Sequence, residues 1–114
     1  ILRAKKLYLA VLTNNKQWIA LTEISGKIFI DNGAEHALLE NGKSLLPAGV
    51  YRVEGDFEQG DVVEVYSHNK LIGRGEVLYS SLELAHAMGK RTDELTNYPI
   101  EVIHRDKWLK IQTK

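Results

Sequence analysis

The sequence has no cysteine, and this absence excludes two classes of small protein. Without thiols, a disulfide framework cannot form, and thiolates cannot hold zinc or an iron–sulfur cluster. Long apolar runs are also missing, because none approaches the ~20 residues that a membrane-spanning helix needs. The apolar segment at residues 7–12 is too short for a signal peptide. We therefore expect a cytoplasmic globular protein with no membrane partner.

An excess of positive charge is absent as well. The 15 Lys and Arg residues are balanced by 15 Asp and Glu residues, so the net charge is zero. Dedicated nucleic-acid binders usually carry a clear basic excess, because phosphate contacts supply most of their affinity. Strong non-specific binding to nucleic acid is therefore not expected, although a local basic face is still compatible with the composition.

The length of the sequence is sufficient for one folded domain. A chain of 114 residues buries roughly two thirds of its unfolded surface, which sustains a core without covalent staples. The chain begins at Ile1 and its only methionine is Met88, so we expect a piece of a longer protein. We interpret residues 1–15 as an N-terminal connection or tail and residues 16–114 as the domain.

The stretch from residue 26 to residue 60 predicts a strand, a helix, a tight loop and a second strand. Residues 28–30 are a short β-prone run, and residues 50–57 form the second. Asn32 followed by Glu35 predicts the start of the helix, with Asn32 as its cap. Ala34, Ala37 and Leu38 fall on one helical face, and Gly42 can adopt the left-handed conformation that ends the helix.

Further short strands follow from apolar and β-branched runs. We expect them at residues 18–21, 62–66, 71–78, 100–103 and 108–111, with a hairpin loop at residues 67–70. Gly73 and Gly75 lie on one face of a strand, which indicates close approach of another backbone or a bend. The pattern has no regular strand–helix alternation. It therefore predicts a mainly β fold with short helices, arranged as a small mixed barrel.

A second helix is expected between Ser80 and Gly89. Ser80 and Glu83 form a capping box, and Leu84, Ala85 and Met88 are expected to face inward. A further helical turn is expected at residues 92–95, where acidic residues occupy the favourable end.

Motifs that carry chemistry are not convincing in this sequence. His104, Arg105 and Asp106 match a kinase catalytic triplet, but the metal-binding asparagine five residues later is replaced by Ile111. We interpret the triplet as a structural corner with an Arg–Asp pair. Gly89 to Thr92 lacks the first glycine of a phosphate loop. The four histidines lack metal-site spacing, so we expect no catalytic residue, no metal ligand and no cofactor in this chain.

Basic side chains remain as candidate phosphate contacts, although most such side chains simply lie in solvent. They are Lys43, Arg52, Arg74, Lys90, Arg91 and Arg105. Lys43 and Arg52 are the best candidates, because they flank a loop rich in backbone N–H groups.

The sequence resembles the PUA domain, an RNA-binding module of pseudouridine synthases and archaeosine transglycosylases. More narrowly, residues 16–109 resemble the C-terminal PUA domain of bacterial glutamate 5-kinases. The matching residues are Trp18-Ile19, Asp31 with Gly33-Ala34, Ser44-Leu45-Leu46-Pro47 with Gly49, Val53 with Gly55-Asp56-Phe57, Gly60-Asp61, Gly73-Arg74-Gly75, Tyr79-Ser80, Gly89-Lys90 and Val102-Ile103-His104-Arg105-Asp106. The resemblance implies a PUA-like pseudo-barrel of mixed strands.

The resemblance also implies an RNA-contacting region. In the RNA-modifying relatives, the loop after the first helix and the following strand touch RNA, which corresponds to residues 41–52 here. The candidate RNA-binding residues are Lys43, Ser44, Arg52 and Arg105.

The kinase resemblance implies a parent transferase that phosphorylates the γ-carboxyl group of glutamate with ATP and Mg²⁺, in the first step of proline biosynthesis. ATP, Mg²⁺ and glutamate would bind an N-terminal amino-acid-kinase domain that this chain lacks. The main hypothesis is an accessory domain that partners this kinase domain and contributes to assembly or regulation. The alternative is an RNA-binding PUA module, and a homo-oligomer is compatible with both.

Overall fold

The structure, a computed structural model, describes residues 16–111, so the expected N-terminal connection at residues 1–15 lies outside the described residues. The strands are β1 (Ile24–Ile30), β2 (Val50–Gly55), β3 (Val62–Ser67), β4 (Lys70–Glu76) and β5 (Trp108–Lys110). The α-helices are α2 (Gln17–Leu21), α3 (Asn32–Leu39) and α4 (Ser81–Ala87). Three single 3₁₀ turns complete the described part: η1 (Pro47–Gly49), η2 (Thr92–Glu94) and η3 (Arg105–Lys107).

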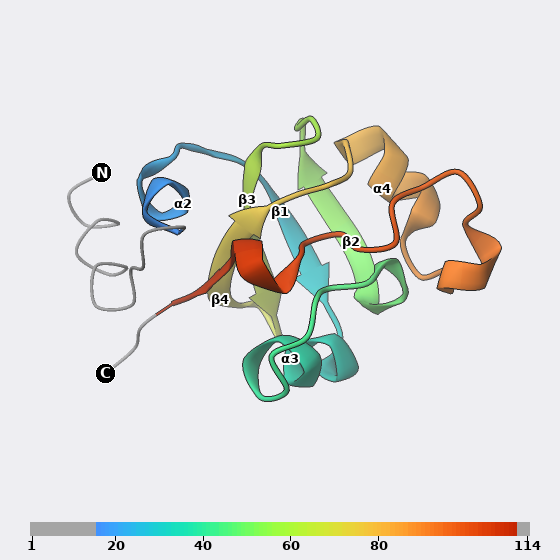
Figure 1. Cartoon of the computed structure of the whole chain (residues 1–114), viewed down its shortest axis with the longest axis horizontal. Helices are drawn as coiled ribbons and strands as arrows, with labels where there is room; N and C mark the ends of the chain where they lie inside the picture. The colour runs from blue at the N-terminus through green and yellow to red at the C-terminus, as the bar shows by residue number, and fades with distance from the viewer. Residues whose placement is uncertain (1–15, 112–114) are drawn as a thin grey trace.

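The five strands form one mixed sheet in the order β2-β1-β3-β4-β5. β1 runs antiparallel to β2 and parallel to β3, whereas β3–β4 and β4–β5 are antiparallel pairs. The helices lie around the sheet, with α3 below it and α2 and α4 toward opposite ends (Figure 1). The mainly β fold with mixed strands and short helices that the sequence predicts is confirmed.

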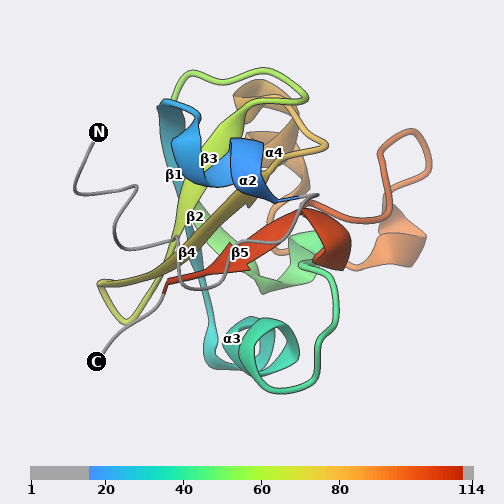
Figure 2. The ribbon, with the colours of Figure 1, turned by 60° about the vertical axis from the view of Figure 1, so that its left-hand side comes forward.

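The core consists of one main cluster and one small one. In β1, Ile28 and Ile30 alternate into the main cluster, where Tyr79 and Phe57 are the largest fully buried side chains. The small cluster contains Ile19, Ala20, Val62 and Leu109, and it includes the buried face of α2, the short helix shown beside the sheet in Figure 2. Both clusters consist of apolar side chains, so burial of this surface is the main stabilising contribution.

Residues 18–21 are helical in the structure, and the predicted strand there is wrong. The reason lies far along the chain in Arg74, which is only 5% exposed. Its guanidinium Nη1 donates hydrogen bonds to the carbonyl oxygens of Thr22 at 3.0 Å, and of Ile19 and Ala20 at 3.3 Å each. A cation at a helix C-terminus satisfies carbonyl groups that otherwise have no partner. Arg74 is therefore a structural residue and is not available as a phosphate contact.

The start of α3 also differs from the prediction. The cap is Asp31, whose Oδ1 accepts a hydrogen bond from the Ala34 N–H at 2.9 Å. Asn32 is the first helical residue instead. The Glu35 carboxylate does not reach back to the cap, because it accepts a hydrogen bond from the Ser67 hydroxyl group. Glu35 thereby joins the helix to the β3–β4 hairpin.

Two other predicted features of the second half are wrong. The sequence predicts that Ala85 of α4 faces inward, but it is exposed, and Ala87 is the buried alanine of this helix. Residues 100–103 make a single bridge between Leu45 and Ile103 rather than a strand, and Ile100 is 65% exposed.

The expected close approach at Gly73 and Gly75 is confirmed. A Cβ atom on Gly73 would lie 2.5 Å from the Leu109 carbonyl oxygen, and one on Gly75 would lie 2.9 Å from the Lys107 carbonyl oxygen. Both carbonyls belong to the β5 region, so the two glycines let the last strand pack on β4. The capping box of Ser80 and Glu83 is also confirmed.

Candidate functional site

An open groove of about 670 Å³ lies between α3 and the turn that precedes β5. Three segments form its walls: the first turns of α3, the loop from residue 43 to residue 49, and residues 101–105. The lining residues are Asp31, Gly33, Ala34, Ala37, Lys43, Ser44, Leu46, Ala48, Gly49, Glu101, His104 and Arg105. Small residues from α3 and η1 form much of this lining, which gives the groove an apolar base with polar groups around it.

Two sets of backbone contacts bring the three segments together. The Asp31 N–H donates to the Gly49 carbonyl oxygen at 3.0 Å, which places η1 against α3. A Cβ atom on Gly49 would lie 2.5 Å from the Ala34 Cβ, so this approach requires a glycine. On the other side, the Leu45 N–H donates to the Ile103 carbonyl oxygen at 2.9 Å, so the loop lies beside residues 101–105.

Three of the four predicted RNA-binding residues meet in this groove. Lys43, Ser44 and Arg105 all line it, and the Ser44 Oγ accepts a hydrogen bond from the Arg105 N–H at 2.9 Å. Arg52 is not part of the groove. Its guanidinium pairs with the Glu54 carboxylate at 2.5 Å and lies 5.1 Å from the centre of the Phe29 ring.

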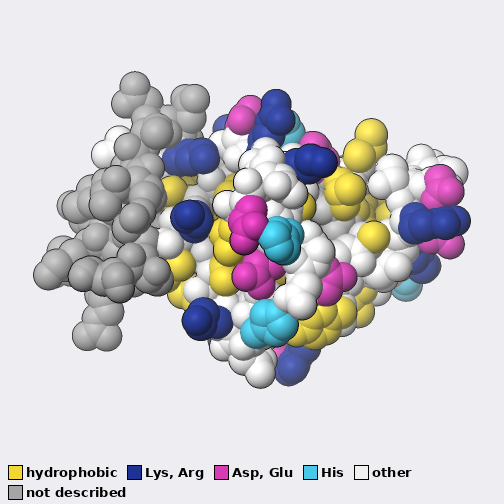
Figure 3. Space-filling model, turned by 90° about the horizontal axis from the view of Figure 1, so that it is seen from below, with side chains coloured by type: hydrophobic (Ala, Val, Ile, Leu, Met, Phe, Trp, Pro, Cys, Tyr) yellow, Lys and Arg dark blue, Asp and Glu magenta, His cyan; other side chains and the backbone are white. Residues whose placement is uncertain are grey.

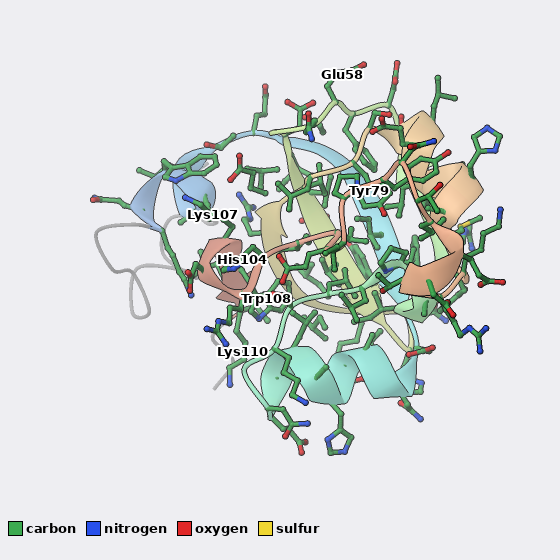
Figure 4. All side chains as sticks on the ribbon, turned by 45° about the vertical axis from the view of Figure 1, so that its right-hand side comes forward. Glu58, Tyr79, His104, Lys107, Trp108 and Lys110 are labelled. Atoms are coloured by element: carbon green, nitrogen blue, oxygen red, sulfur yellow. The ribbon has the colours of Figure 1, made fainter. Side chains whose placement is uncertain are left out.

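His104 and Glu101 also line the groove, and sequence reasoning did not single them out for this site. The His104 Nδ1 accepts a hydrogen bond from the Asp106 N–H at 3.0 Å, which leaves its Nε2 to face Glu101 Oε1 at 4.0 Å. Asp106 therefore pairs with His104, and the expected Arg–Asp pair of this corner is wrong. Figure 4 shows His104 on the turn that faces α3. The Leu45–Ile103 bridge places these residues, and no local spacing indicates it.

The charges of the groove are mixed. Lys43 and Arg105 supply cations, whereas Asp31 and Glu101 supply carboxylates. Among residues 16–111, no group of three or more His, Asp or Glu side chains is arranged to hold a metal ion. The face that includes α3 carries single Lys and Arg side chains with Asp, Glu and His side chains between them (Figure 3). The groove therefore offers charged groups of both signs to a polar ligand.

Comparison with known proteins identifies the family. A family model described as the PUA domain matches residues 26–99. Glutamate 5-kinase 1 of Bacillus licheniformis is 53% identical over 106 residues, which are 91% of this chain and 29% of that protein. The glutamate 5-kinase of Oceanobacillus iheyensis is 54% identical over 99 residues, which are 84% of this chain and 27% of that protein. The chain thus spans less than a third of the length of these relatives.

Solved structures agree on the fold. A PUA domain from Aeropyrum pernix K1, solved as a tartrate complex, is 28% identical with a TM-score of 0.51, over 71% of this chain and 43% of that one. A chain of the archaeal box H/ACA sRNP Nop10–Cbf5 complex is 20% identical with a TM-score of 0.56, over 83% of this chain and 26% of that one.

The described residues contain no helix with the length and apolar character that a membrane crossing requires. The match of the PUA family model over residues 26–99, which is more than half of the chain, leads to one conclusion. The chain belongs to the PUA domain family.

Proposed function

We propose that this chain is a non-catalytic accessory PUA domain of a glutamate 5-kinase and that it contributes to assembly or regulation of the catalytic part. The observation that carries the proposal is the 53% identity to a glutamate 5-kinase over 91% of this chain but only 29% of the relative. In this proposal, ATP, Mg²⁺ and glutamate bind an N-terminal amino-acid-kinase domain, and that domain is the partner of this chain.

The test compares three proteins: the product of the full reading frame, the same protein without these 114 residues, and the 114-residue chain alone. The readouts are ATP-dependent phosphorylation of glutamate and the oligomeric state. We expect the truncated protein to keep the chemistry but to change its kinetic constants or its assembly, and the 114-residue chain to turn over no ATP. Turnover by the 114-residue chain, or an upstream region that encodes no kinase, would contradict the proposal.

A second candidate function is RNA binding, and the groove favours it. Lys43, Ser44 and Arg105 all line the groove, and the Ser44 Oγ accepts a hydrogen bond from the Arg105 N–H. Two cations predict a modest electrostatic contribution, because each neutralised phosphate contributes a slope of about −0.7 to −0.9 in log K against log salt. Part of one chain of a solved H/ACA RNP that is bound to a substrate RNA has a similar fold, with a TM-score of 0.53 at 18% identity over 79% of this chain and 24% of that one.

A titration with structured RNA at rising salt tests this candidate. We expect the double variant Lys43→Glu, Arg105→Glu to bind more weakly and to lose about 1 unit of the salt slope for each removed contact. The matched control is Lys90→Glu, Arg91→Glu, which makes the same change of charge at exposed positions that do not line the groove. An absence of binding at low salt, or equal losses in both variants, would contradict RNA binding in the groove.

A further inference from the structure

The outer edge of β2 has no strand beside it. Among residues 16–111, β2 pairs only with β1, and it lies at the end of the sheet order. The backbone hydrogen bonds of the described turns and loops involve none of residues 51–55. α4 contacts β2, and its Leu84 and Ala87 are buried in the main cluster. The second row of β2 backbone groups is therefore available to another strand.

The side chains along this edge carry opposite charges two residues apart. Arg52 pairs in register with Phe29, and Glu54 pairs with Lys27, so Arg52 and Glu54 lie on the same face of the sheet. The ion pair between them confirms this placement. Exposed edges are often protected by charge of one sign, which repels a second copy. The edge of β2 carries both signs, so charge does not protect it. A β-bulge at Tyr51, where the pairing with β1 shifts its register, interrupts the edge at its start, and the regular part begins at Arg52.

A second copy of β2 fits this edge in one register. Two identical antiparallel strands can be related by a two-fold axis that is perpendicular to the sheet. The axis then lies midway between the two copies of one residue, which pair with each other, and all paired residues share a face. An axis at Val53 places Arg52 opposite Glu54 of the second copy twice. An axis at Arg52 or at Glu54 places like charges directly opposite each other, which is destabilising. Charge therefore selects the register that is centred on Val53.

We propose that two copies of this chain associate through their β2 strands, which pair antiparallel about a two-fold axis at Val53. The two five-stranded sheets then become one continuous sheet across the dimer. Tyr51, which is 55% exposed, is the residue that the β-bulge leaves without a partner in β1, and its ring lies 6.4 Å from the Phe29 ring, so the pairing that we propose involves residues 52–54. The proposal concerns the strand itself and does not depend on whether the chain is joined to a kinase domain.

A nucleic acid is a poorer occupant of the same edge. Each cation near the edge lies beside an acidic or aromatic group, because Arg52 lies beside Glu54 and Lys27 faces the Tyr66 ring at 5.3 Å. Arg52 and Glu54 within β2 and Asp56 directly after it carry one positive and two negative charges, so the strand offers no positive excess for phosphate. A self-complementary surface is instead what a two-fold interface requires.

Charge-swap variants test the proposal in sedimentation equilibrium of the 114-residue chain. Arg52→Glu places acids opposite acids, and Glu54→Arg places arginines opposite arginines, so each variant alone should dimerise at least about tenfold more weakly. An equimolar mixture of the two should form a heterodimer, because the acids of one variant then face the arginines of the other. The double variant Arg52→Glu, Glu54→Arg should recover the homodimer.

The mixture separates an interface effect from a structural one, because the Arg52–Glu54 pair within each chain stays broken there. Arg91→Glu is the control, since Arg91 is an exposed residue outside β2, and it should dimerise like the unchanged chain. The proposal is overturned by an unchanged chain that stays monomeric up to about 1 mM. Dimerisation that ignores both single swaps, or a mixture that stays monomeric, also overturns it.

Discussion

Arg74 shows how one buried side chain decides local structure at a distance. Its guanidinium donates to three carbonyl groups of residues 19–22, and this contact holds α2 against the sheet. The sequence pattern indicates a surface cation at Arg74. It also indicates a strand at residues 18–21, where a four-residue apolar run does not distinguish a strand from a helix. A contact that spans more than 50 residues leaves no local signal, so this error could not be avoided from periodicity alone.

Replacing Arg74 with methionine should destabilise the protein by about 2–3 kcal/mol, because a methionine fills space but leaves buried carbonyl groups without their donor. Urea denaturation measures the loss. Hydrogen exchange of the α2 amides should become faster than exchange in β3. Arg91→Met changes an exposed arginine and should cost less than about 0.5 kcal/mol. Equal losses in the two variants would contradict the structural role of Arg74.

Ionisation of the Tyr79 phenol makes the free energy of unfolding depend on pH in the alkaline range. Burial, the nearby Glu83 carboxylate and Tyr98 all raise the pKa of Tyr79 above its ordinary value of 10.0. The folded state therefore holds the phenol proton when the unfolded chain releases it. This contribution to stability is fully present below about pH 10 and is lost as the pH rises toward the folded pKa.

Replacing Tyr79 with phenylalanine should remove this alkaline loss, because no proton remains to titrate at that position. The variant should also lose about 1 kcal/mol near pH 7, since the Tyr79 hydroxyl group donates to the Pro99 carbonyl oxygen at 2.6 Å. Denaturation between about pH 8 and 11 measures both effects. Tyr51→Phe, at an exposed position, should keep the original pH dependence. A Tyr79→Phe variant with an unchanged alkaline slope would be inconsistent with a raised pKa.

At the scale of elements, the strands were largely predictable and the packing between them only partly so. Runs such as residues 62–66 are rich in β-branched side chains, and the structure places β3 there. Gly73 and Gly75 correctly indicated close approach, because a bare position within a strand often marks the passage of another backbone. The partner strand β5 could not be identified from the glycines, since they indicate available space and not its occupant.

Gly73→Ala should destabilise the protein by about 2 kcal/mol or more, because the new methyl group would overlap the Leu109 carbonyl oxygen and displace β5. Thermal or urea denaturation measures the loss. Gly33→Ala is the matched control, because its nearest atom is the Asp31 Oδ1 at 3.6 Å and alanine favours a helix. It should be neutral or slightly stabilising. Comparable losses at the two positions would be incompatible with the close packing of β5.

At the scale of the whole molecule, the decisive contact is the bridge between Leu45 and Ile103. It joins the loop after α3 to the segment before β5 and completes the groove. The loop after α3 and the family resemblance indicate Lys43 and Ser44 as candidates, and both residues line the groove. The meeting of Lys43 with Arg105 depends on the Leu45–Ile103 pairing, which joins segments far apart along the chain, so the chemistry of the complete groove could not be derived from the sequence.

Two isoleucines near this bridge provide a matched comparison. Ile103 is fully buried, whereas Ile100 is 65% exposed. Ile103→Ala should cost about 2–5 kcal/mol through the cavity that it leaves, and Ile100→Ala should cost less than about 0.5 kcal/mol. Urea denaturation distinguishes these outcomes. If the two variants were equally stable, the segment at residues 101–105 would not be anchored as the structure shows.

The bridge also has a consequence for synthesis on the ribosome. Translation delivers α3 and the loop at residues 43–49 long before Glu101, His104 and Arg105 emerge. Since those three residues supply one of the three walls, a nascent chain that has been made only as far as α4 has an incomplete groove. A ligand that contacts all three walls of the groove would consequently bind the completed chain and not a chain that is still being synthesised.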